Sequence, residues 1–169
     1  MPASPGLLEL VATAQATAKL SEDRISQALF HIGGSNETDL HAKELRRASK
    51  ALELVAVDIF SIFEARMQHH FKRGPFSRKL KTLLLASKQP DLADRLHKYY
   101  LVVNVLKHGK GASYRELLKS PTFLFAVTAP PADPTDEAQA NKSLIDVTAP
   151  GFFEGLTNTI IEAYHFLEG

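Results

Sequence analysis

Three polar side chains that recur along one otherwise apolar segment offer the most distinctive chemistry in this 169-residue sequence: His97, Asn104 and His108. Successive residues of an α-helix are rotated by about 100°, so positions seven and eleven apart nearly superimpose. A histidine imidazole exchanges a proton near neutral pH, and an asparagine amide both donates and accepts hydrogen bonds. The stripe therefore predicts acid–base or ligand-binding chemistry along one face of a helix.

The same stripe also has a purely structural explanation. Buried polar groups are costly unless they are hydrogen-bonded, so these residues can instead bond to neighbouring helices or face solvent. Asp58 poses a similar choice, because it interrupts an apolar run. Facing inward, it would be a supporting buried acid for His97 or His108; facing outward, it would lie on the exposed edge of its helix.

Charge is unevenly distributed along the chain. Residues 72–119 contain 12 Lys/Arg and 3 Asp/Glu, whereas residues 120–169 contain 1 and 7. Such a segment either binds an anionic partner or pairs with the acidic end of the chain. For an anionic partner, Lys107, Lys110 and His97 are candidate phosphate-binding residues, and Tyr100 and Tyr114 are candidates for stacking on bases. Tyr99 is expected in the core.

The run Asn104-Val-Leu-Lys-His108-Gly-Lys-Gly, near the end of a predicted helix, resembles the signature region of the HEPN superfamily. The resemblance implies a bundle of four or five helices, commonly a homodimer. It also implies metal-independent cleavage of RNA, with an arginine and a histidine of the motif meeting across the dimer.

The match to this motif is partial. His108 stands at the motif histidine and Asn104 at its polar position, but the arginine position holds Val103. Attack by a 2′-hydroxyl on its phosphate needs a proton acceptor, which His108 supplies, and a cation to stabilise the developing charge. Lys107 or Lys110 would have to replace the arginine. We therefore expect a degenerate domain that binds RNA or a nucleotide, with His108 and Asn104 as catalytic candidates for weak RNase activity.

Two other functions remain open. A dimeric structural or protein-interaction bundle would use the polar stripe only to hold its core or interface together. A metal site would gather His97, His108 and an acid, for which Asp58 and Glu64 are candidates. His69 and His70 are expected to point about 100° apart and not to share one site. The preferred interpretation requires neither a metal nor a cofactor.

The elements that must position these residues are mostly helices. Apolar residues at helical spacing predict helices over 7–34, 39–71, 77–87, 90–108, 114–119 and 150–169, and Gly or Pro punctuates their ends. Ser113 and Glu116 form a capping-box pattern at the start of the fifth. Two β-prone runs, 122–128 and 143–148, predict a small hairpin, with a flexible Pro- and Asp-rich loop at 129–142. The fold class is thus an all-α bundle of five or six helices with a C-terminal β-hairpin.

Length and composition limit the number of domains and the classes of chemistry that are possible. The length and the 44% hydrophobic content fit one domain over residues 1–169. The absence of cysteine excludes disulfides and thiolate chemistry and suits a reducing cytoplasm. No apolar run reaches the roughly 18 residues of a membrane span, and residues 1–6 lack the basic start of a secretory signal. We expect a cytoplasmic homodimer with RNA, a nucleotide or a cognate protein as partner, and no membrane association.

Overall fold

The structure is a computed structural model that describes residues 4–34, 38–130 and 143–169. These residues form six α-helices, one 3₁₀ helix (η1) and two short strands. In chain order they are α1 (Leu7–Gly34), α2 (Thr38–Met67), η1 (Gln68–His70), α3 (Phe76–Ala86), α4 (Pro90–His108), α5 (Ala112–Lys119), β1 (Ala126–Val127), β2 (Ile145–Asp146) and α7 (Phe152–Glu168). The predicted all-α bundle with a small hairpin is confirmed.

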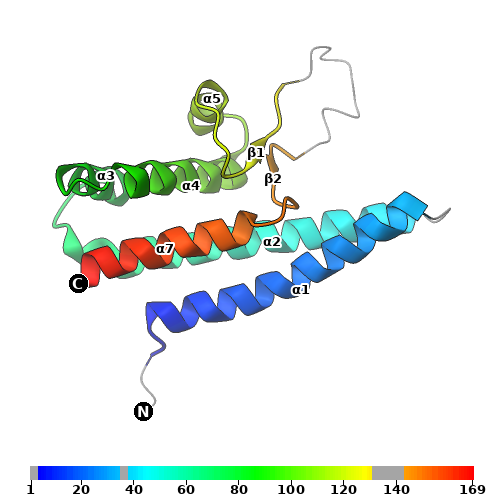
Figure 1. Ribbon diagram of the computed structural model, residues 1–169, viewed down its shortest axis with the longest axis horizontal. Coiled ribbons are helices and arrows are strands. Elements are labelled where there is room, and N and C mark those ends of the chain that lie inside the picture. Colours follow the sequence, from blue (N-terminus) through cyan, green and yellow to red (C-terminus); the bar gives the residue numbers. More distant parts are fainter. Residues whose placement is uncertain (1–3, 35–37, 131–142) are drawn as a thin grey trace.

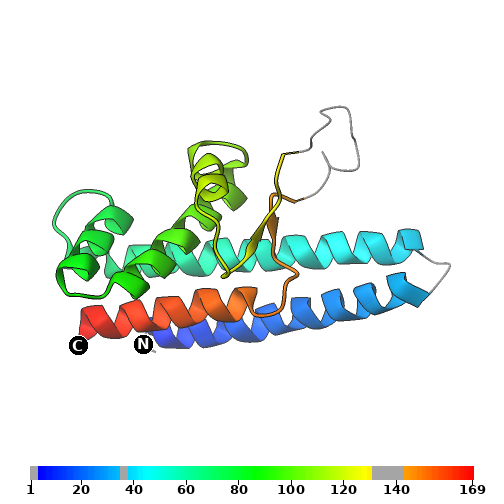
Figure 2. The same ribbon diagram turned by 45° about the horizontal axis from the view of Figure 1, so that its top comes forward.

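The longest elements, α1 and α2, form an antiparallel helical hairpin (Figures 1 and 2). α7 packs against both of them, and α4 lies on α2 and α7. The short helices α3 and α5 pack on α4. In both views the far end of the α1–α2 hairpin extends beyond α4 and α7. α4 therefore contacts four other helices, α2, α3, α5 and α7, and it contains the residues of the polar stripe.

The residues of α1 that contact α2 follow a heptad pattern, and small residues occupy several of its positions. The buried positions of α1 alternate by three and four residues, as in a coiled coil, and several are small: Leu7, Val11, Ala18, Ser21, Ile25 and Ala28. The larger residues Leu20 and Leu29 are 63% and 47% exposed. The small side chains let α1 approach α2 closely, so the larger leucines lie outside the seam.

The middle of α2 supplies the centre of the core. Phe60 and Phe63 are fully buried, and Phe63 also makes an edge-to-face contact with Phe76 at the start of α3. The α-helix ends at Met67 rather than at the predicted residue 71, and the chain continues as η1. This change of helix type brings His69 and His70 to the end of the bundle.

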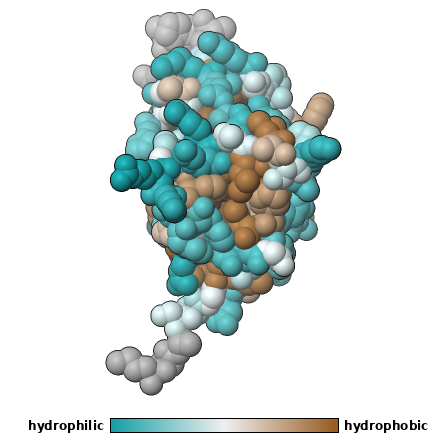
Figure 3. All heavy atoms as spheres, turned by 90° about the vertical axis from the view of Figure 1, so that its left-hand side faces the viewer, coloured by the Kyte–Doolittle hydropathy of each residue, from teal (hydrophilic) through white to brown (hydrophobic). Residues whose placement is uncertain are grey.

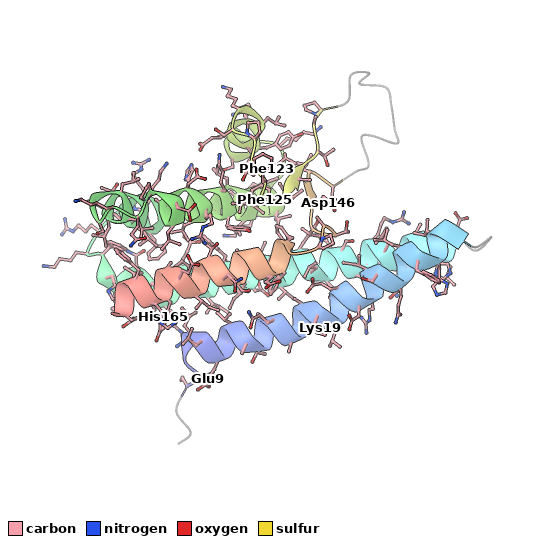
Figure 4. All side chains as sticks on the ribbon, in the orientation of Figure 1. Glu9, Lys19, Phe123, Phe125, Asp146 and His165 are labelled. Carbon is pink, nitrogen blue, oxygen red and sulfur yellow. The ribbon has the colours of Figure 1, made fainter. Side chains whose placement is uncertain are left out.

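The C-terminal hairpin is real but short. β1 and β2 are antiparallel, with Ala126 opposite Asp146 and Val127 opposite Ile145. Phe125 anchors it, because its ring is buried against Tyr99 of α4 and Phe152 of α7, whereas Phe123 is fully exposed (Figure 4). Most of the predicted loop at 129–142 lies outside the described residues.

The surface at one end of the molecule is partly apolar. Seen from the left of Figure 1, hydrophobic side chains gather in the middle of this face and hydrophilic ones surround them (Figure 3). No helix in the described ranges is both long enough and apolar enough to cross a membrane.

Candidate anion-binding pocket

Two members of the polar stripe on α4 bond to α5. The Nε2 of His97 lies 2.5 Å from Oε2 of Glu116, and Nδ2 of Asn104 donates to Oγ of Ser113 over 3.2 Å. His97 and Asn104 therefore bond to a neighbouring helix, as the structural explanation of the stripe expects. The stripe therefore determines where α5 docks on α4.

Docking of α5 also closes a pocket of about 340 Å³ between α3, α4 and α5. Ligand pockets usually start at about 300 Å³, so this one accommodates a small ligand or one nucleotide unit of a longer chain. Polar side chains dominate its chemistry. The lining consists of Pro75, Ser77, Arg78, Lys81, His97, Tyr100, Leu101, Ala112, Ser113 and Glu116.

Ser77 has a buried hydroxyl with an unused bonding capacity. Its Oγ is shielded from solvent and has no hydrogen-bond partner among the described residues. Such a group costs about 1–3 kcal/mol relative to a satisfied one. Because Ser77 lines the pocket, a rotation of its side chain toward the pocket would let a ligand atom supply the missing bond.

Positive charge beside Ser77 points to an anionic ligand. Arg78 and Lys81 lie on α3 and line the same pocket. Within the described ranges, neither has a salt-bridge partner, whereas Arg95 is paired with Asp91 and with Glu162 of α7. The remaining charge of residues 72–119 is also largely exposed, at Lys72, Arg73, Lys79, Lys88, Lys107, Lys110, Arg115 and Lys119.

A larger hollow of about 590 Å³ beside α2 is chemically less suited to an anion. Its lining includes Lys50 and Glu53, which form a salt bridge over 3.5 Å. Burial raises the pKa of Glu53, and Lys50 acts in the opposite direction. Each hollow contains one carboxylate, Glu53 here and Glu116 in the smaller pocket. We place the candidate site at the smaller pocket because Glu116 is bonded to His97 there, which leaves Arg78 and Lys81 without an acidic partner among the described residues.

The end of α4 lies apart from this pocket. His108 is eleven residues after His97, which corresponds to about 16 Å along a helix axis. His108, Lys107 and Lys110 are exposed and do not line the pocket. Val103, at the motif position of the arginine, is 1% exposed and belongs to the core. No side chain at position 103 can reach a site on the surface without leaving the core.

Two predicted site residues are corrected. Asp58 is exposed and is not a supporting buried acid, because the buried face of α2 is defined by residues such as Ala56, Ile59 and Phe63. Tyr114 is 3% exposed and cannot stack on a base, and its hydroxyl donates to the carbonyl oxygen of Thr128. Tyr100 does line the pocket, and Tyr99 is buried as predicted.

The metal site proposed from His97, His108 and an acid of α2 is not assembled in the described part of the chain. His97 is bonded to Glu116, and Glu64 lies near Lys107 instead. Burial raises the pKa of Glu64, an effect that the positive charge of Lys107 partly opposes.

Sequence reasoning missed the acceptors on α5 and the polar residues on α3. Ser113 and Glu116 were assigned to a capping box, but α5 begins at Ala112 with Gly111 as N-cap and has no side-chain cap bond. Both side chains bond across to α4 instead. Arg78 and Lys81 line the pocket because α5 docks beside α3, an arrangement that no local pattern in the sequence indicates.

No protein-family model, curated protein or solved structure matches this chain.

Proposed function

We propose that this chain binds RNA or a nucleotide through the pocket between α3, α4 and α5, and that binding rather than cleavage is its function. The observation that carries the proposal is the buried, unpartnered hydroxyl of Ser77 beside two cations that no acid neutralises within the described residues. Phosphate oxygens accept hydrogen bonds from a hydroxyl, a guanidinium and an ammonium at once.

The pocket also offers a surface for a base. The rings of His97 and Tyr100 are near-parallel, with centroids 6.2 Å apart and an interplanar angle of 30°. Exposed aromatic faces bind bases of single-stranded nucleic acids with little dependence on sequence. A phosphate at Arg78 and Lys81 with a base near Tyr100 therefore uses both kinds of contact that single-strand binding requires.

Catalysis has weaker support than binding. Val103 contributes no charge to stabilise a phosphorane, and His108 lies outside the pocket. Within the pocket, the Nε2 of His97 is engaged by Glu116. The degenerate HEPN-like motif thus supports the proposed class of ligand without supplying a complete cleavage site.

The test is the affinity of the purified protein for a fluorescently labelled single-stranded oligouridylate, measured by anisotropy over a series of salt concentrations. The double substitution Arg78→Ala/Lys81→Ala should weaken binding at least about tenfold, because hydrogen bonds to charged groups contribute about 1.5–3 kcal/mol each. The slope of log K against log salt should become shallower by about 1.4, since each phosphate contact contributes about 0.7 for a single strand.

Two further variants make this test specific. Lys43→Ala/Arg47→Ala removes the same charge from an exposed part of α2 and should change the affinity little. Lys107→Ala/Lys110→Ala tests the end of α4, which the motif singled out. If the loss follows Lys107 and Lys110, the site is at the end of α4; if no variant loses affinity, or no RNA binds, the proposal fails.

A second candidate function, self-association as a structural dimer, has an observation of its own. The far end of the α1–α2 hairpin exposes Leu29, Phe30 and Leu40, with Phe30 79% exposed. Two antiparallel hairpins related by a two-fold axis can pair as a four-helix bundle and bury such residues. This interface lies on α1 and α2, so dimerisation and ligand binding at α3–α5 are independent proposals.

A further inference from the structure

The most concentrated group of metal-ligating side chains lies at the opposite end of the bundle from the hairpin tip. His69 and His70 of η1 face Glu168, the last residue of α7. One potential ligand atom from each of the three lies within 4.8 Å of the others. On a continuous α-helix, two consecutive histidines would point about 100° apart. In the structure both lie in η1, beyond the end of α2, and their ring centroids are only 4.2 Å apart.

We propose that these three residues form a site for a divalent transition-metal ion, with Zn²⁺ as its reference ligand. The Nε2 atoms of His70 and His69 lie 3.2 and 3.9 Å from Oε1 of Glu168. Ligands of a tetrahedral Zn²⁺ at about 2.0–2.2 Å from the metal are about 3.3 Å apart. In the observed arrangement the Nε2 of His70 donates a hydrogen bond to Glu168, so coordination requires that the metal ion replaces this proton and that the exposed side chains rotate.

His69 is already held in a form suited to coordination. Its Nδ1 lies 2.8 Å from the carbonyl oxygen of Arg66, an acceptor, so Nδ1 carries the proton in that bond. The Nε2 atom of a neutral ring then keeps its lone pair on the side of Glu168. Histidines that ligate metals usually make this kind of bond to a backbone carbonyl through the other ring nitrogen.

The ligand set determines the class of metal. Two neutral imidazoles and one carboxylate bring a single negative charge, and this N₂O set suits Zn²⁺ and its neighbours rather than Ca²⁺ or Mg²⁺, which take oxygen ligands. Three protein ligands leave a fourth position for a solvent molecule. The bound ion would join residues 98 positions apart in the chain, and so would fasten the end of α7 to the end of α2.

The test uses the full chain stripped of metal by chelation and then titrated with Zn²⁺ near pH 7.5 by calorimetry. One ion should bind per chain, and the melting temperature should rise with Zn²⁺ and fall back when EDTA is added. Co²⁺ in place of Zn²⁺ should give the visible absorption of a four-coordinate site. His70→Ala and Glu168→Gln should each weaken binding at least about tenfold, and Glu168→Gln preserves the size of the side chain.

His31→Ala is the matched control. His31 is another exposed histidine whose ring stacks on that of His41, 4.6 Å away, at the far end of the hairpin. This variant should bind Zn²⁺ as the unmodified chain does. Binding that persists in both His70→Ala and Glu168→Gln, or that is lost in His31→Ala, would overturn the proposal. Absence of Zn²⁺ binding by the unmodified chain would also overturn it and leave only an ion pair of histidines with Glu168.

Discussion

At the scale of single residues, the candidate pocket depends on groups whose bonding capacity the fold leaves unused. Most buried polar groups here are satisfied: Thr157, for example, is fully buried, accepts a bond from Gln15 and donates within its own helix. The Ser77 hydroxyl has no such partner among the described residues. We therefore assign the Thr157 hydroxyl a role in stability and the Ser77 hydroxyl a role in ligand binding.

Replacing Ser77 with alanine should therefore weaken ligand binding without weakening the fold. Removing an unsatisfied buried hydroxyl should leave the free energy of unfolding unchanged or raise it by up to about 1 kcal/mol, since it removes an uncompensated group. The affinity for the labelled oligouridylate should fall several-fold. Urea unfolding and anisotropy measure the two quantities.

Thr157→Val serves as the control, because it removes a satisfied hydroxyl of similar burial. Its expected cost is about 1 kcal/mol of stability. If Ser77→Ala destabilises the protein as much as Thr157→Val does, the Ser77 hydroxyl is already satisfied in the folded protein. The main support for the pocket would then be lost.

At the scale of elements, α4 and α7 approach each other closely at one point of their contact. Gly155 of α7 lies against the Tyr99 hydroxyl of α4, and a β-carbon at Gly155 would be 2.2 Å from that oxygen. The same tyrosine packs against Phe125 and Phe152, so it links the hairpin, α4 and α7. The distance between α4 and α7, and with it the position of the pocket, therefore depends on a glycine near the start of α7.

Gly155→Ala should destabilise the protein by up to about 2 kcal/mol. Overpacking of a core costs about 1–3 kcal/mol, and the better helix propensity of alanine returns only part of it, at about 1 kcal/mol. In a Tyr99→Phe background the clashing oxygen is absent, and the nearest remaining atom is 3.4 Å away. There the same substitution should be neutral or stabilising.

A double-mutant cycle by thermal or urea unfolding measures this change of sign. Gly111→Ala is the control, because a β-carbon there meets nothing within 4 Å. Equal effects of Gly155→Ala in both backgrounds would show that the close contact with the Tyr99 hydroxyl does not govern the α4–α7 distance.

At the scale of the whole molecule, the two ends of the bundle have different chemistry. One end holds η1 and the end of α7, with the His69–His70–Glu168 group. The other is the overhanging tip of the α1–α2 hairpin (Figure 2). Its large apolar residues Leu29, Phe30 and Leu40 are exposed. The pocket lies between α3, α4 and α5, away from the overhang. The three proposals can therefore be tested separately.

Phe30→Glu tests the dimer at this scale. Light scattering after size-exclusion chromatography should give twice the chain mass of 18.6 kDa for the unmodified protein and 18.6 kDa for the variant. A charge placed in an apolar interface is costly to desolvate, so the dimer should dissociate.

Phe123→Glu is the matched control, because Phe123 is another exposed phenylalanine that precedes the β-hairpin (Figure 4). This variant should remain a dimer. A monomeric unmodified protein, or loss of the dimer in Phe123→Glu alone, would contradict self-association through the α1–α2 hairpin.

The sequence alone determined where most elements begin and end. Pro90 at the start of α4, Gly109 at its end and the β-prone runs around Val127 and Ile145 all predicted structure correctly, because turns, helix stops and periodicity depend on residues only a few positions apart. The sequence also placed the polar stripe on one face of α4. These features are local, so no knowledge of packing was needed.

Only the tertiary structure decided which faces meet. The α1 seam uses Ala18, Ser21 and Ala28 rather than Leu20 and Leu29, because close approach of two helices rewards small side chains over large ones. Likewise His97 meets Glu116 because α5 docks on α4, and His70 meets Glu168 because the end of α7 lies beside η1. Pairings of this kind depend on the relative positions of whole elements, which no local pattern in the sequence specifies.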